Sequence, residues 1–159
     1  MRITILCVGK VREAFYREAS AEYLKRLGRY VKIAVREVAD EKTPDGAGEA
    51  ASRQIREREG ERLLRLIPDG AFVIALAIEG ESMDSVTFSR KLAERMVSGT
   101  SHIVFVIGGS LGLSDSVLVR ADRKLSFSAM TFPHQLMRVI LLEQIYRAFR
   151  IQNGEPYHK

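Results

Sequence analysis

The chain has 159 residues, of which 46% are hydrophobic and 28% charged, values typical of a soluble globular protein that can bury its own core. Its single cysteine, Cys7, lies in an apolar run, which excludes a disulfide framework and favours a reducing, cytoplasmic location. The net charge of +5 and the isoelectric point of about 9.6 favour a polyanionic partner such as nucleic acid, but only mildly.

The first half of the chain predicts alternating strands and helices. The apolar run 3–8 predicts a buried strand, and apolar residues at helical spacing predict a helix over 11–29. Residues 31–38 alternate as a half-exposed strand does. After a polar loop, a charge-rich helix is expected over 51–67, and the apolar run 71–78 predicts a central strand covered on both faces.

The second half continues this alternation. Asp84 or Ser85 is a candidate N-cap for a helix that ends near Val97. Residues 102–109 predict a buried strand, 115–123 a short helix and 124–128 a short strand. Pro133 precedes a last helix, from 135 to about 151. The pattern predicts one α/β domain over 1–159, with a mostly parallel sheet and helices on both faces.

Loops after parallel strands are where such folds bind ligands. The first of them lacks G-x-G-x-x-G, which counts against a dinucleotide fold, and no P-loop motif occurs. The segment IGGSLGLS places Gly108, Gly109 and Gly112 directly after a buried strand. These glycines allow a ligand to approach the backbone closely, although a plain tight turn also accounts for them.

Two more loops follow strands, in LSFSAMTFPH and AFVIALAIEG. If all three loops meet at one sheet edge, they form a pocket of backbone amides and apolar walls. Such a pocket suits an adenine ring and a thioether-bearing ligand better than a phosphate. No CxxC or HExxH motif occurs and the chain has only three histidines, so no metal site is expected. No segment is long and apolar enough to span a membrane.

The last helix is apolar nearly all round over its first half, which favours burial at the seam of a homodimer. Glu143 and Arg147 have the spacing of a structural ion pair. Arg138 lies one turn after His134, on the same face and beside the Ser/Thr loop. The tail NGEPYHK is by default disordered, but its Pro-Tyr-His run is stiffer than most disordered tails.

The segments IGGSLGLS, LSFSAMTFPHQLMRVILLEQIYRAF and NGEPYHK resemble those of the ribosomal RNA large subunit methyltransferase H family. The resemblance covers the whole chain and is most specific from Ile107 onward. It implies a SPOUT-type α/β knot, in which a C-terminal trefoil knot forms the cofactor pocket, and a homodimer. It also implies transfer of a methyl group from S-adenosylmethionine to N3 of pseudouridine-1915 in 23S rRNA, on the assembled ribosome.

The family's motifs match specific residues of this chain. The resemblance implies that the cofactor is bound by Leu76, Gly108, Phe127, Ser128, Ala129, Met130, Thr131 and Phe132. His134, Arg138, Tyr157 and His158 are then expected to face the RNA. His134 or His158 is a candidate general base, Arg138 a candidate for stabilising the developing charge, and Tyr157 a candidate for stacking on a flipped base.

Two other functions remain open at this point. A basic α/β dimer that binds the ribosome or another RNA without catalysis predicts no tight adenosyl ligand. An enzyme that binds a different nucleotide through GGSLGLS predicts that nicotinamide or adenine nucleotides stabilise the fold while S-adenosylmethionine does not.

Overall fold

The computed structural model describes all 159 residues and contains one five-stranded sheet. Every pair of neighbouring strands is parallel, and the strand order is β2-β1-β4-β3-β5. The strands are β1 (Arg2–Val8), β2 (Lys32–Val38), β3 (Phe72–Ser82), β4 (His102–Ile107) and β5 (Arg123–Ser126). The prediction of a mostly parallel sheet is confirmed.

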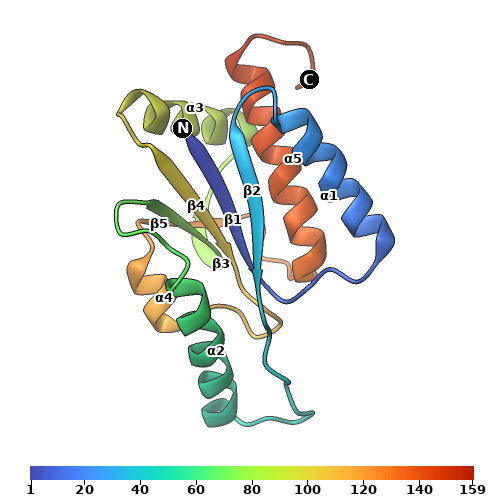
Figure 1. The fold of residues 1–159 in the computed structure, drawn as a ribbon, viewed down its shortest axis with the longest axis vertical. Coiled ribbons are helices and arrows are strands. Elements are labelled where there is room, and N and C mark those ends of the chain that lie inside the picture. The colour runs from blue at the N-terminus through green and yellow to red at the C-terminus, as the bar shows by residue number, and fades with distance from the viewer.

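Five helices connect the strands and cover both faces of the sheet (Figure 1). They are α1 (Ala14–Leu27), α2 (Glu49–Leu64), α3 (Ser85–Val97), α4 (Asp115–Arg120) and α5 (His134–Gln152). Helices α1, α3 and α5 share one hydrophobic cluster with the sheet, while α2 and α4 share the other. The predicted three-layer arrangement is therefore confirmed, whereas the threading of a knot stays a prediction.

Strand β1 shows how the sequence produces two layers of core. Ile3, Ile5 and Cys7 point into the cluster under α5, while Leu6 and Val8 point into the cluster under α2, as the two-residue period of a strand requires. All five side chains are at most 1% exposed. Burying each large aliphatic side chain contributes about 1.5–3 kcal/mol, so the central strands supply much of the hydrophobic stabilisation.

Several boundaries differ from the sequence prediction for identifiable reasons. Strand β3 runs four residues beyond the predicted end because its second half pairs again with β5, after a register shift between Leu76 and Glu81. Helix α4 ends early because Asp122 turns back onto β3: its N–H donates to the Val73 carbonyl (2.8 Å) and its carboxylate accepts from the Val73 N–H (2.7 Å).

Helix α5 lies against the sheet and packs against both α1 and α3; α1 runs beside it in Figure 1. Most apolar side chains in its second half are buried in this core. Leu136, Met137, Val139 and Ile140 remain only half-buried. The apolar character of the helix therefore arises mostly within one chain, and a smaller stripe is left uncovered.

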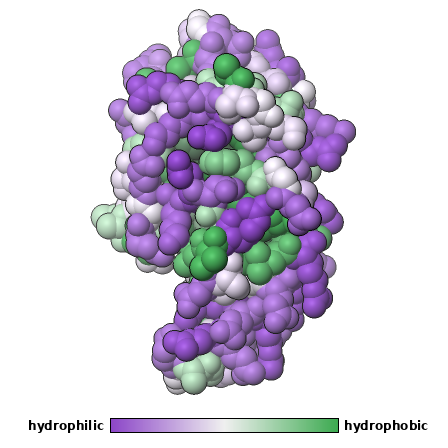
Figure 2. Space-filling view, turned by 90° about the vertical axis from the view of Figure 1, so that its left-hand side faces the viewer, coloured by the Kyte–Doolittle hydropathy of each residue, from purple (hydrophilic) through white to green (hydrophobic).

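No helix is both long enough and apolar enough to cross a membrane. The surface in Figure 2 is largely hydrophilic, and apolar atoms gather near the middle of the face shown there.

Candidate active site

Two loops leave β4 and β5 at the carboxyl edge of the sheet, on either side of β3, which itself continues to Ser82. Ala75 of β3 is paired with Val106 of β4, and Leu76 of β3 with Leu125 of β5. The segment after β4 begins at Gly108, close to Leu76, whereas the segment after β5 begins at Phe127, beside the end of β3, because Ser126 pairs with Ser82 after the register shift. The third loop expected from the sequence, in AFVIALAIEG, is instead part of β3, so two of the three predicted loops meet at this edge.

The glycine loop is held together by its own backbone. Gly109 and Gly112 form an isolated β-bridge, and Gly112 has a positive φ of 83°. A Cβ atom at Gly108 would lie 2.7 Å from the carbonyl carbon of Gly112, closer than real contacts allow. Gly108 is thus required by the folding of the loop itself, whether or not a ligand binds there.

The loop after β5 is organised by two serines. The Ser126 hydroxyl donates to the Ser128 carbonyl (3.2 Å), and the Ser128 hydroxyl accepts from the Met130 N–H (3.0 Å). Ala129 and Thr131 are exposed, Phe127 and Phe132 half-buried, and the Met130 side chain is 73% exposed. An exposed methionine beside exposed backbone leaves an apolar wall without a partner in this chain.

This loop crosses the carboxyl edge from β5 to the end of β1, where His134 begins α5. A Cβ atom at Gly9 would lie 3.7 Å from His134 Nε2 and 3.8 Å from the Asp40 side chain. Burial of the ring, and then the positive charge of Arg138, lowers the pKa of His134 below its ordinary value, against the opposing effect of Asp40. The imidazole is therefore neutral at neutral pH and has a lone pair available.

Arg138 does not face solvent, contrary to the expectation that it faces the RNA. Its side chain is 3% exposed, and its guanidinium pairs with Glu37 at 2.6 Å. It also donates to the carbonyls of Val8 (3.4 Å) and Gly9 (2.5 Å) at the end of β1. The reason lies in the tertiary packing: the carbonyls at the end of a central strand need donors, and Arg138 supplies them from the second turn of α5.

The C-terminal tail folds back along α5 rather than extending away from it. Gly154 adopts a positive φ of 65° after the helix, and Tyr30 and Arg150 both donate to Glu155. Tyr157 then packs edge-on against Tyr146, with ring centroids 5.0 Å apart. These contacts place the last residues beside the middle of α5.

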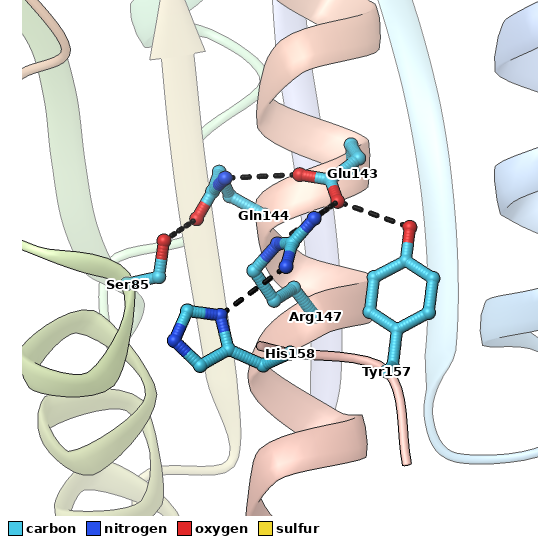
Figure 3. Close-up of polar contacts among 6 residues, drawn as sticks. All are labelled: Ser85, Glu143, Gln144, Arg147, Tyr157 and His158. Carbon is cyan, nitrogen blue, oxygen red and sulfur yellow. Dashed lines mark hydrogen bonds and ion pairs between the residues drawn. The ribbon is translucent and has the colours of Figure 1, made fainter.

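A polar network ties the tail to α5 and α3 (Figure 3). Glu143 accepts from Arg147 (2.6 Å), from the Tyr157 hydroxyl (3.0 Å) and from the Gln144 amide (2.9 Å). The Gln144 oxygen accepts from the Ser85 hydroxyl at the start of α3 (2.7 Å). Arg147 also reaches Nδ1 of His158 (3.2 Å). The expected ion pair between Glu143 and Arg147 is confirmed, and it forms the centre of this network.

The network changes what Tyr157 can do in this chain. Arg147 lies over its ring, 4.7 Å from the centroid, and its hydroxyl is bound by Glu143. Burial and then this hydrogen bond raise the pKa of Tyr157 to about 12, so it stays neutral. Here the ring holds the tail in place, and a base that stacked on it would have to share the ring with Arg147.

His158 and Phe127 line one cavity of about 410 Å³. Its other walls come from the start of α3, the end of β5 and the middle of α5, and they comprise Met83, Asp84, Ser85, Val86, Phe88, Leu125, Ser126 and Gln144. The cavity thus joins the loop after β5 to the tail. His134 and Arg138 do not line this cavity. Within one chain, the predicted catalytic residues therefore lie at two separate places.

Two residues at these sites, one behind the glycine loop and one in the tail network, were not among the candidates from the sequence. Glu59 of α2 is buried behind the glycine loop: a Cβ atom at Gly109 would lie 3.3 Å from its carboxylate oxygens. Burial raises the pKa of Glu59, and its Oε1 has no hydrogen-bond partner. Gln144 links the tail network to α3. Neither has a distinctive sequence signal, because both lie among ordinary helical polar residues.

Comparison with known proteins agrees with this geometry. A family model described as "Predicted SPOUT methyltransferase" matches residues 1–158. The chain is 60% identical over 159 residues to "Ribosomal RNA large subunit methyltransferase H" of Bifidobacterium adolescentis, and 55% identical to the protein of the same name from Clostridium tetani. Both matches cover 100% of each chain.

Among solved structures, one described as a "probable methylase family protein" from Haemophilus influenzae is similar, with a TM-score of 0.51. The sequence identity is 15%, and the match covers 99% of this chain and 70% of the other, so it supports the fold alone. The family model and the full-length relatives show that this chain belongs to the SPOUT methyltransferase family.

Proposed function

We propose that this protein methylates 23S rRNA of the large ribosomal subunit, at N3 of pseudouridine-1915, with S-adenosylmethionine as the methyl donor. The observation that carries the proposal is the position of the loops after β4 and β5 on either side of β3 at one sheet edge, within a chain of the SPOUT methyltransferase family. The full-length relatives named for methylation of large-subunit rRNA support the choice of substrate.

The residues at this edge fit an adenosyl ligand. The glycine loop presents backbone without side chains, and the exposed Met130 and half-buried Phe132 offer apolar surface to a planar ring. Leu76, Gly108 and the segment 127–132 would hold the cofactor. When bound, S-adenosylmethionine supplies a methyl group already activated by its sulfonium, so the protein mainly has to align the acceptor with it.

Methylation at N3 requires removal of the proton that this nitrogen carries. His134 is suited to accept it, because burial keeps its imidazole neutral at neutral pH. Arg138 acts indirectly: it binds the end of β1 and Glu37 and thereby fixes the turn of α5 that carries His134. Arg138 is therefore a positioning residue.

We further propose that the protein works as a homodimer. About 20 Å of helix axis separates His134 from Arg147, where the tail is bound. Leu136, Val139 and Ile140 form a half-buried stripe between them. A two-fold pairing of α5 with α5 of a second copy would cover this stripe. If the two-fold axis crosses the helices, they run antiparallel, and the first turn of one would approach the tail of the other.

The proposed substrate also fits the charge of the chain. A net charge of +5 on 159 residues favours contact with a polyanion but is modest for recognising one site in free rRNA. A folded ribosomal particle presents shape as well as phosphate, so we place the reaction on the assembled ribosome.

Calorimetric titration with S-adenosylmethionine and S-adenosylhomocysteine tests the cofactor site. We expect saturable binding of both. Gly108→Ala should weaken it at least about tenfold, because overpacking a close contact costs about 1–3 kcal/mol. Gly70→Ala is the matched control: no atom lies within 4 Å of its added Cβ, so its affinity should equal that of the unaltered protein.

Transfer of labelled methyl groups from S-adenosylmethionine to ribosomes lacking this modification then tests the reaction. A folded protein that binds ribosomes but neither adenosyl ligand would contradict the proposal and favour the non-catalytic RNA-binding protein. Binding of nicotinamide or adenine nucleotides in place of S-adenosylmethionine would favour the other nucleotide-dependent enzyme.

A further inference from the structure

The contact between Arg147 and His158 determines which nitrogen of the imidazole carries the proton. A guanidinium has only donors and does not lose its proton in proteins. Nδ1 of His158, 3.2 Å from Arg147, must therefore accept the hydrogen bond with its lone pair. In a neutral imidazole the proton then lies on Nε2, so that nitrogen is a donor.

Arg147 is itself held firmly enough to impose this choice. Its Nε and a terminal nitrogen donate to the same Glu143 oxygen, at 3.0 and 2.6 Å. That oxygen also accepts from Tyr157, one residue before His158, so the tail and the guanidinium share one carboxylate. The third nitrogen of the guanidinium is left for His158. The orientation of the Arg147 guanidinium is therefore fixed by Glu143 of α5, which is itself bound by Tyr157 of the tail.

The other edge of the ring faces the cavity. Figure 3 shows the second ring nitrogen of His158 pointing away from Arg147, and His158 lines the cavity that contains Phe127. The charged groups around the ring are Arg147 on α5 and Asp84 at the start of α3, with Glu143 behind the arginine. Adding a proton to Nδ1 would replace the hydrogen bond to Arg147 with a contact between two cations.

We propose that His158 acts in this cavity as a hydrogen-bond donor through Nε2–H, and that Arg147 is the positioning residue that fixes this tautomer. The group it would recognise is a carbonyl oxygen of a pyrimidine base. This inference rests on the proposed function, because it assigns His158 a task within it. Neither residue's tautomeric role follows from belonging to the family.

The chemistry of N3 explains why a donor is useful there. When the N3–H bond breaks, the nitrogen keeps the electron pair, and negative charge spreads onto the two flanking carbonyl oxygens. The electron pair forms the N–CH₃ bond, and the electrons of the broken C–S bond stay on sulfur. The N3 proton goes to His134 of the second copy, which the proposed pairing of α5 helices brings toward this tail. Nε2–H of His158 stabilises the charge on one carbonyl oxygen, as an oxyanion-hole donor does.

Nitrogen NMR of the imidazole rings tests the tautomer without requiring activity. With ¹⁵N-labelled protein at neutral pH, we expect His158 Nε2 to have the shift of a protonated nitrogen and Nδ1 that of an unprotonated one. The His158→Gln spectrum identifies the resonances. Arg147→Met should produce a mixture of tautomers, and Arg147→Lys, which retains a donor, should move them less. An unprotonated Nε2 in the unaltered protein would overturn the proposal.

Two isosteric replacements test the role in methyl transfer. Glutamine at 158 places an amide N–H near the position of Nε2, whereas asparagine places its amide near Nδ1. Loss of one such donor costs about 10²–10³-fold in rate. We therefore expect His158→Asn to lose about that much while His158→Gln stays within about tenfold of the unaltered protein, with a pH–rate profile that keeps its acidic limb.

An active His158→Asn with an inactive His158→Gln would overturn the donor role, and so would loss of the acidic limb in His158→Gln, since the limb would then belong to a base at 158. These outcomes are separable from failure of the proposed function. If the unaltered protein transferred no methyl group to ribosomes, the function would be refuted, while the nitrogen shifts would still decide the tautomer.

Discussion

Arg138 and Arg147 lie on the same helix, and each forms an ion pair of 2.6 Å, but their surroundings differ. Arg138 is 3% exposed and binds Glu37 together with two backbone carbonyls of β1. Arg147 is 24% exposed and binds only side chains, of Glu143 and the tail. The first joins α5 to the central sheet, and the second holds a terminal segment beside a cavity.

The difference indicates how one helix can serve two purposes. A charge buried against backbone carbonyls cannot move without leaving them unpaired, so the start of α5 is fixed with the fold. A partly exposed pair of side chains contributes less to the free energy of folding, because solvent screens its charges. We therefore expect loss of Arg138 mainly to affect stability, and loss of Arg147 mainly to affect activity.

Replacing each arginine by methionine gives the largest expected contrast. Arg138→Met leaves the buried carbonyls of Val8 and Gly9 without their donor, and each buried polar group left unpaired costs about 1–3 kcal/mol. Arg147→Met should cost less, about 1 kcal/mol, because the pair is partly exposed and Glu143 keeps its hydrogen bonds to Tyr157 and Gln144. Urea denaturation of both variants measures the difference. Equal losses of unfolding free energy would show that the two ion pairs are equivalent.

The fold could largely be anticipated from the sequence, whereas this contrast could not. Apolar runs such as 102–107 and the alternation along β2 determine strands and faces locally, so five strands and five helices were predicted in the observed order. The length of β3 was underestimated because its second half pairs only after a register shift beside Glu81. That pairing depends on β5, far along the chain.

The site was predictable where it depends on strand ends and unpredictable where it depends on distant partners. Gly108 and the segment after β5 follow strands directly, and parallel pairing brings them together. The burial of Arg138 depends on Glu37, on a strand about 100 residues earlier. The sequence pattern places Arg138 one turn after His134, and only the family resemblance implies that it faces the RNA.

Tyr157→Phe tests the tail alone and should have a smaller effect. It removes the hydroxyl that donates to Glu143 while Arg147 continues to pair with that carboxylate, at a cost of about 0.5–1.5 kcal/mol. Because the pKa of Tyr157 is raised from 10.0 to about 12, its contribution is complete below pH 10 and is lost as the pH rises toward 12.

Spectrophotometric titration of the tyrosines measures this directly. The unaltered protein should contain a tyrosine that ionises well after the others, and Tyr157→Phe should lack it. A late-titrating tyrosine that persisted in the variant would mean that the hydroxyl of Tyr157 is not the buried one, and that the tail does not rest on α5 as described.

Replacing His134 should change the free energy of unfolding least. The change should appear at low pH, whereas that of Tyr157→Phe depends on high pH. Burial, and then the charge of Arg138, lowers the pKa of His134 in the folded chain below its ordinary 6.5, so the unfolded chain binds the proton more readily. The stability that depends on the neutral ring is complete above about pH 6.5 and declines as the pH falls below it.

Unfolding free energies at pH 8 and pH 5 should thus differ less in His134→Gln than in the unaltered protein. An equal difference in His134→Gln and in the unaltered protein would show that protonation of His134 is not coupled to folding.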